Sequence, residues 1–217
     1  MSVALARQLR EGTKKAHTMA ENTGFVSCFL KGVVDKSTYK NLLIDLYLVY
    51  SAMEDEIRRL SDLGNGIISS IDFPELNRKK ALEEDLIFFF GTEWSNQVRP
   101  TNSAKEYVER IHYVAQESPE LLLGHHYTRY IGDLSGGQIL KRIAQKAMNL
   151  NDDGLHFYEF NLIPDEKEFK LEYSQVLNSL PIENAIVPLI VDEANICLLY
   201  TSPSPRDRTR SRMPSSA

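Results

Sequence analysis

The chain has 217 residues, of which 42% are hydrophobic and 25% are charged, and its formal net charge is −5. This length suits one domain with a sizeable core and is too short for two large ones. The acidic balance argues against nucleic-acid binding, which requires a basic surface. No apolar run approaches the roughly 20 residues of a membrane-spanning helix. With only Cys28 and Cys197, the chain fits a reducing compartment such as the cytoplasm.

Helical periodicity runs through most of the chain. In the first segment, the apolar residues at helical spacing are Leu5, Leu9, Ala16 and Ala20. Residues 37–60 predict a long amphipathic helix with Ser37 as its N-cap. Further helices are predicted over 77–90, 103–118, 118–131, 164–180 and 182–195. Because alternating strand patterns and hairpin signals are absent, the sequence predicts a single all-α domain.

The last 21 residues, Cys197 to Ala217, differ in character from the rest, with four arginines against one aspartate. A basic end rich in serine and proline is compatible with a disordered interaction arm. The stretch CLLYTSPSPRD, however, matches one reading frame of a common transposase-type sequencing adapter. We therefore expect a domain over residues 1–196 with a truncated final helix, and a non-native, disordered tail over residues 197–217.

The segment RYIGDLSGGQILKRI (129–143) combines an amphipathic helix with three glycines, Gly132, Gly136 and Gly137. Each glycine costs about 1 kcal/mol relative to alanine inside a helix. The letters LSGGQ match the signature of ABC-type ATPases, but the chain has no Gly-Lys dipeptide for a phosphate-binding loop, which excludes that class. Two interpretations remain: a turn between two helices, or a bent helix whose bare backbone approaches a flat ligand. Taken alone, the segment favours the turn.

His17 lies one helical turn before Glu21. A histidine at the edge of an apolar stripe is most often an ordinary half-buried residue, and this spacing also describes a simple surface pair. The same spacing allows the imidazole to bind iron through one nitrogen while the carboxylate orients the other.

The remaining histidines and acidic clusters give weaker candidates. Because adjacent helical positions point in different directions, we expect one of His125 and His126 in the core and the other at the surface. The clusters 54–56 and 83–85 are expected to be solvated helix faces. No set of Glu-x-x-His pairs supports a di-iron bundle.

Four stretches together resemble the heme oxygenase family: GTKKAHTMAEN, LYLVYSAMEDEI, FPELNRK and, above all, HYTRYIGDLSGGQILKRIAQKAM. The resemblance covers roughly residues 2–195 in order and is greatest to the cyanobacterial and algal branch. It implies an all-α fold with heme b, as substrate and cofactor, between a proximal helix and a kinked distal helix. It also implies O₂- and reductant-dependent opening of the heme ring to biliverdin, with release of CO and ferrous iron.

The resemblance assigns roles to individual residues. It makes His17 the iron ligand, with Glu21 as its hydrogen-bonding partner. The residues implied in heme binding are Arg10, Lys14, His17, Glu21, Tyr127, Gly132, Ser135, Gly136, Gly137 and Lys170. The residues implied in proton delivery through ordered water are Asp133, Arg129 and Tyr50. Replacing Asp133 with alanine should then divert the reaction from biliverdin without loss of heme.

The resemblance also implies partners. With no flavin or nicotinamide motif in the chain, electrons must come from outside, and reduced ferredoxin is the expected donor. A bilin reductase is a possible consumer of the product, the protein is expected to be a monomer, and its compartment is the cytoplasm, or the plastid stroma in an alga.

One departure from the family pattern and one rival function bear on these expectations. Ser174 stands where the family usually has an arginine, which should loosen the seating of heme. The rival function is a heme carrier or sensor that kept the fold and lost turnover, and the presence of Asp133 and all three glycines argues against it.

Overall fold

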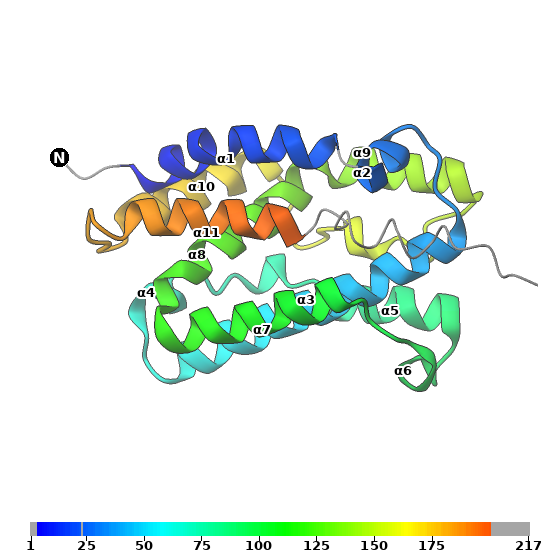
Figure 1. Ribbon diagram of the computed structural model, residues 1–217, viewed down its shortest axis with the longest axis horizontal. Coiled ribbons are helices and arrows are strands. Elements are labelled where there is room, and N and C mark those ends of the chain that lie inside the picture. The colour runs from blue at the N-terminus through cyan, green and yellow to red at the C-terminus, as the bar shows by residue number, and fades with distance from the viewer. Residues whose placement is uncertain (1–3, 23, 201–217) are drawn as a thin grey trace, which may run out of the picture.

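The computed structural model describes residues 4–22 and 24–200 (Figure 1). These residues contain helices and no strand, which confirms the predicted all-α fold. The α-helices are α1 (Leu5–Glu21), α2 (Gly24–Leu30), α3 (Lys36–Asp62), α4 (Gly66–Ser69), α5 (Lys79–Phe90), α6 (Trp94–Gln97), α7 (Asn102–Glu117), α8 (Leu122–His126), α9 (Gly132–Met148), α10 (Glu166–Ser179) and α11 (Val187–Tyr200). Shorter turns are η1 (Pro74–Leu76), η2 (Pro119–Leu121), η3 (Tyr127–Ile131) and η4 (His156–Tyr158). Within the described part of the chain, no helix is both long and apolar enough to cross a bilayer.

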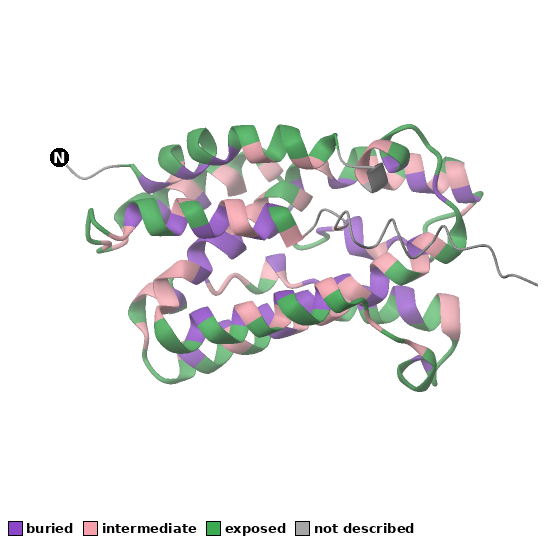
Figure 2. Ribbon diagram, in the orientation of Figure 1, coloured by how far each residue is buried: buried purple, intermediate pink, exposed green. Residues whose placement is uncertain are grey.

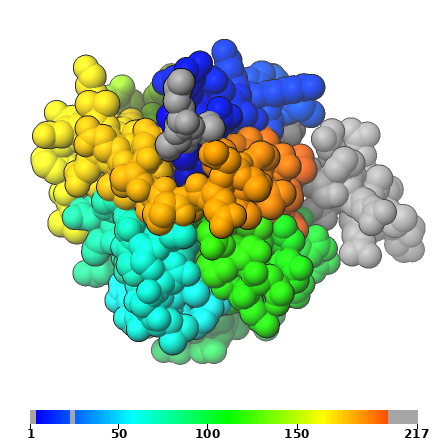
Figure 3. Space-filling view, turned by 90° about the vertical axis from the view of Figure 1, so that its left-hand side faces the viewer, coloured from blue at the N-terminus to red at the C-terminus, as the bar shows by residue number. Residues whose placement is uncertain are grey.

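The helices form two layers joined by α8 (Figure 1). In the view of Figure 1, α3, α5 and α7 lie below, and α1, α10 and α11 lie above. Helix α11 packs against both α1 and α8, and α3 packs against α5 and α7. Buried residues follow the faces where the layers meet, whereas the outer face of α1 is exposed (Figure 2). The end-on view shows the chain around residues 180–190 packed between α1 and the lower layer (Figure 3).

The start of α3 corrects the predicted cap. The carboxylate of Asp35, not the hydroxyl of Ser37, caps the helix by accepting a hydrogen bond of 2.9 Å from the N–H of Thr38. A carboxylate at this position combines a good N-cap with a favourable charge at the positive end of the helix dipole.

The glycine segment is helical, so the turn interpretation is wrong. A π-helical turn, Tyr127–Ile131, joins α8 directly to α9, which begins at Gly132. Such π-helical insertions kink a helix without ending it, and they occur frequently at functional sites. The structure therefore supports the bent helix that the alternative interpretation describes.

Helices α8 and α11 cross at very short range. A Cβ atom on Gly124 would lie 2.6 Å from the carbonyl oxygen of Ile190, so only glycine fits. Beside this crossing, Glu193 accepts two hydrogen bonds from Arg110 (2.9 and 2.6 Å) and its Oε1 lies 2.9 Å from His125 Nε2. Burial raises the pKa of Glu193, but these two partners outweigh it and lower the pKa to about 2.

The expectation that one of His125 and His126 lies at the surface is wrong. Both are buried, because α8 is covered on opposite sides. His125 faces Glu193, whereas His126 Nδ1 lies 2.7 Å from the hydroxyl of Tyr173 on α10. Burial lowers the pKa of His126 to about 3, so this imidazole is neutral at physiological pH.

The acidic clusters are not simply solvated. Asp85 is fully buried and Glu54 partly buried, because each carboxylate accepts backbone N–H groups from a distant segment. A buried N–H without a partner is costly, and a carboxylate is a strong acceptor.

Helix α11 continues through Tyr200, with Cys197 and Leu198 buried. The predicted change from native domain to tail after residue 196 stays a prediction, and residues 201–217 lie outside the described residues.

Candidate functional site

Two of the three glycines of α9 face open space. Among the residues that the structure describes, none has an atom within 4 Å of a Cβ placed on Gly132 or on Gly136, apart from the helix's own neighbouring backbone. Gly137 points elsewhere, toward Tyr158, where a Cβ would make ordinary contacts starting at 3.6 Å. Each helical glycine costs about 1 kcal/mol relative to alanine. Packing within the protein does not explain Gly132 and Gly136, whereas a flat ligand pressed against the backbone does.

Asp133 lies in the first turn of the same helix, and two of the other predicted residues lie beside it. The hydroxyl of Tyr50, on α3, donates a hydrogen bond to Asp133 Oδ2. Arg129 Nη2 lies 3.9 Å from the same oxygen, and its guanidinium lies 5.2 Å from the centre of the Tyr50 ring. Burial raises the pKa of Asp133 well above its ordinary value. A carboxyl group with a raised pKa can hold and release a proton nearer to neutral pH.

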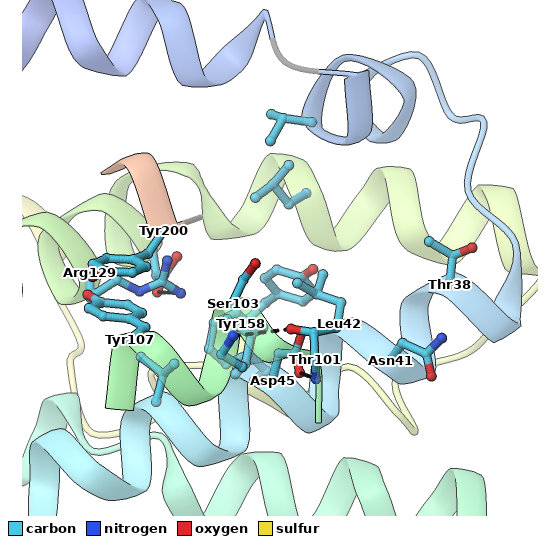
Figure 4. Close-up of a pocket in the computed structure, with 17 residues that line it drawn as sticks. Thr38, Asn41, Leu42, Asp45, Thr101, Ser103, Tyr107, Arg129, Tyr158 and Tyr200 are labelled. Carbon is cyan, nitrogen blue, oxygen red and sulfur yellow. Dashed lines mark hydrogen bonds and ion pairs between the residues drawn. The ribbon is translucent and has the colours of Figure 1, made fainter. Parts of the chain in front are cut away.

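A pocket of about 360 Å³ adjoins this group, between α9 and the helices α3 and α7 (Figure 4). Its walls are largely apolar, from side chains such as Leu46, Val49 and Phe157, and Asp133 lines it. At one end Arg129 lies beside Tyr107 and Tyr200, whose rings stack 4.9 Å apart. The Nε of Arg129 is buried, and no residue that the structure describes forms a hydrogen bond with it. The pocket therefore has room for water next to a buried donor and a carboxyl group.

The predicted iron ligand lies on α1. His17 Nδ1 is 3.6 Å from Glu21 Oε1, and both side chains are more than half exposed, at 58% and 51%. His17 is therefore not a histidine buried in the core. Glu21 is the one polar partner of its ring among the residues that the structure describes.

The predicted cations lie on α1 and α10. Lys170 Nζ lies 3.2 Å from Ser135 Oγ on α9 and 3.4 Å from Glu166. Tyr127, in the π-helical turn η3, lies near Arg10 of α1. Burial raises the pKa of Tyr127, and the nearby charge of Arg10 lowers it. Lys14 is exposed on the same helix as Arg10.

Ser174 does not replace the missing arginine. Its hydroxyl donates to the carbonyl oxygen of Lys170 at 2.7 Å, within its own helix. This arrangement offers no positive charge to a ligand.

Sequence reasoning missed a group of aromatic residues behind α9. The ring of Phe157 packs against that of Tyr50, with centres 5.6 Å apart, and Tyr158 covers Gly137. The aromatic run at 157–160 after the turn glycine Gly154 is a local hint, but its contacts come from the tertiary fold.

Comparisons with known proteins identify the family. The "Heme oxygenase" family model matches residues 3–200. The chain is 59% identical over 195 residues to heme oxygenase 1 of Synechocystis sp. PCC 6803, covering 90% of this chain and 80% of that protein. The chain belongs to the heme oxygenase family. It is also 54% identical over 193 residues to the heme oxygenase of Rhodella violacea, covering 88% of this chain and 81% of that protein.

Solved structures of heme oxygenases agree with this fold. Heme oxygenase-1 of Synechocystis sp. PCC 6803, in complex with heme, superposes with a TM-score of 0.89 at 56% identity, over 92% of this chain and 90% of that chain. The heme oxygenase of Leptospira interrogans gives 0.87 at 44% identity, over 92% and 97%. The protein is accordingly an enzyme that uses heme as substrate and cofactor and opens its ring to biliverdin, with release of CO and iron.

Proposed function

We propose that heme lies between α1 and the glycine face of α9, with His17 as the iron ligand and Glu21 as the group that orients the imidazole. The observation that carries this proposal is the open space beside Gly132 and Gly136, two glycines one helical turn apart on α9. The exposed ring of His17, with a carboxylate as its partner, supports it. When bound, heme supplies the iron at which O₂ is activated and is itself the molecule oxidised.

Asp133, Tyr50 and Arg129 would then deliver protons on the side of the heme opposite His17. Burial raises the pKa of Asp133, which brings its proton exchange nearer to neutral pH, and the hydroxyl of Tyr50 fixes the orientation of its carboxyl group. The adjoining pocket would hold ordered water between these groups and the reaction site. Asp133, Tyr50 and Arg129 would deliver protons through this water and not by direct contact with the reaction site.

The ring's orientation is set by contacts to its propionates. Lys170 and Ser135 already lie together at the rim between α10 and α9, and Arg10, Lys14 and Tyr127 offer cations and a hydroxyl from the α1 side. Charge-assisted contacts of this kind contribute about 1.5–3 kcal/mol each. With Ser174 bonded to its own helix, one such contact is missing, and we expect looser seating than in a protein with arginine there.

Reduced ferredoxin is the proposed electron donor. Because ferredoxins are acidic, the docking surface should be basic, and the candidate cations are Arg10, Lys14, Lys15 and Lys170. Propionate binding competes with docking as the role of some of these residues. A bilin reductase would consume the product. The protein would act as a monomer in the cytoplasm, or in the plastid stroma of an alga.

One experiment separates the enzyme from a heme carrier. Purified protein is mixed with heme and reduced ferredoxin under air while the Soret band is followed. Loss of this band with the appearance of a biliverdin spectrum supports turnover with this donor. A heme spectrum that stays stable both with ferredoxin and with a chemical reductant supports a carrier. If only the chemical reductant gives biliverdin, the choice of ferredoxin as donor is wrong, but the protein is still an enzyme.

A further inference from the structure

The segment 152–160, here called the buttress segment, lies between α9 and α10 and contains η4. It packs against a different face of α9 from the one with open space, because Tyr158 covers Gly137. The amide of Gln138 also donates to the carbonyl oxygen of Tyr158 at 3.1 Å. The buttress segment is thus fastened to the helix that carries Asp133.

Two charged side chains hold the backbone of this segment. Asp85, on α5, is completely buried, and its carboxylate accepts the N–H groups of His156 (2.8 Å) and Phe157 (2.9 Å). The ring Nδ1 of His156 lies 2.9 Å from the same carboxylate. From the other side, Arg78 donates to the carbonyl oxygens of Phe157 and Glu159. A segment with only one short turn of helix depends on such partners for its backbone groups.

The anchored segment places the side chain of Phe157 against Tyr50 of α3. Its ring meets the ring of Tyr50 at an angle of 62°, with centres 5.6 Å apart. The hydroxyl of Tyr50 donates to Asp133. A chain of direct contacts therefore leads from Asp85 through Phe157 and Tyr50 to Asp133.

We propose that Asp85 is a positioning residue for heme cleavage, which holds Phe157 against Tyr50 and thereby fixes the hydroxyl that Asp133 accepts. This inference rests on the proposed function of Tyr50 and Asp133. The geometry calls for a carboxylate, since three N–H groups share its two oxygens. Asparagine has one acceptor oxygen and would turn an NH₂ group toward one of these donors.

The test is a double-mutant cycle that combines Asp85→Asn with Tyr50→Phe. The rate of biliverdin formation is measured in single turnovers, and the ring signals of labelled tyrosines are recorded by NMR in the heme-free proteins. We expect Asp85→Asn to slow the reaction about tenfold alone, and about twofold or less when Tyr50 is already phenylalanine, because contacting residues couple in this way. It should also shift the ring signals of Tyr50 and Tyr158.

Two further variants keep the test decisive. Ile111→Val removes a buried methyl group on α7, a helix that is not part of the buttress segment, and should leave both tyrosine signals in place. Phe157→Leu keeps the N–H that Asp85 accepts and removes the ring that faces Tyr50, so it should reproduce the slowing. If Asp85→Asn fails to fold, Phe157→Leu carries the test in its place.

Equal slowing by Asp85→Asn in both backgrounds, or tyrosine signals that stay unmoved, would overturn the proposal. So would tyrosine shifts of the same size in Ile111→Val, which would indicate general loosening. If Tyr50→Phe alone keeps the normal rate, the proposed role of Tyr50 fails, and the ring signals alone then decide whether Asp85 positions Tyr50.

Discussion

The two faces of α9 differ in what surrounds them. The packed face carries Gly137 and Gln138 and is covered by the buttress segment, through ring contacts and hydrogen bonds. The open face carries Gly132 and Gly136, beside which a Cβ would meet no atom of the described residues. On the packed face, contacts with other residues of the chain account for the residues present. On the open face, the proposed heme would account for the glycines.

Two glycines of the same kinked helical run sharpen this contrast. Gly124, on α8, is required by the backbone of α11, which a Cβ would approach to 2.6 Å. Gly136 has no such neighbour in the described part of the chain. Gly124 is required by packing, whereas we assign Gly136 to the proposed heme site, so the same substitution should have opposite effects on the stability of the heme-free protein.

The largest expected effect is at Glu193, where α11 packs against α7 and α8. Glu193→Gln should lower the free energy of unfolding at pH 7 by about 3 kcal/mol, because the pKa of this carboxyl lies near 2 in the folded protein, against an ordinary 4.5. A lowered pKa stabilises the folded state above pH 4.5, and this contribution is lost as the pH falls toward 2. Urea unfolding of both proteins at pH 7 and pH 3 should therefore show a smaller difference at pH 3. An equal difference at both pH values would contradict the assignment.

The next effect concerns chemistry at the start of α9. Asp133→Ala should lower the yield of biliverdin roughly a hundredfold, the usual range for loss of a proton-transfer group, while heme still binds. Heme affinity is measured by absorbance titration and biliverdin by its visible spectrum. Asp62→Ala, at an exposed aspartate near the end of α3, is the control and should behave as the unmodified protein. An unchanged biliverdin yield in Asp133→Ala would refute the role.

The substitution Gly124→Ala tests the packed crossing of α8 and α11. The added methyl group collides with backbone atoms, which have no rotamer to escape to, and we expect a loss of about 2 kcal/mol in the free energy of unfolding. Denaturant unfolding of the heme-free protein measures it. Unaltered stability would mean that the helices separate easily, and that the crossing does not fix the fold.

The smallest effect has the opposite sign. Gly136→Ala should raise the free energy of unfolding of the heme-free protein by about 0.5–1 kcal/mol, because alanine is the better helix former and its methyl group meets no atom. The same methyl group should weaken heme binding. Both quantities are measured on one sample, by denaturant unfolding and heme titration. A gain in stability with no loss of heme affinity would place heme away from this face.

The sequence predicted the parts of the molecule that depend on local pattern. The amphipathic spacing predicted the helices, and the motif around Asp133 predicted a bent helix through its resemblance to a family. The association of Tyr50, Arg129 and Asp133 follows from that resemblance, and these residues do lie together.

Burial was less predictable, because it depends on contacts between distant segments. Glu83 and Glu84 are exposed as expected. Their neighbour Asp85 is buried, and its carboxylate accepts hydrogen bonds from N–H groups about 70 residues farther along the chain. His126 is buried because α10 covers it from the side opposite α11. No periodicity within one helix contains this information.

If heme lies between His17 and the open face of α9, the axial ligand of its iron is the imidazole of His17. Electron paramagnetic resonance of the ferric heme complex is compared for the unmodified protein, His17→Ala, and His112→Ala as a control at another exposed histidine. We expect a nitrogen-ligand signature in the unmodified and control proteins, its loss in His17→Ala, and its return when imidazole is added. The same signature in His17→Ala without imidazole would contradict the account.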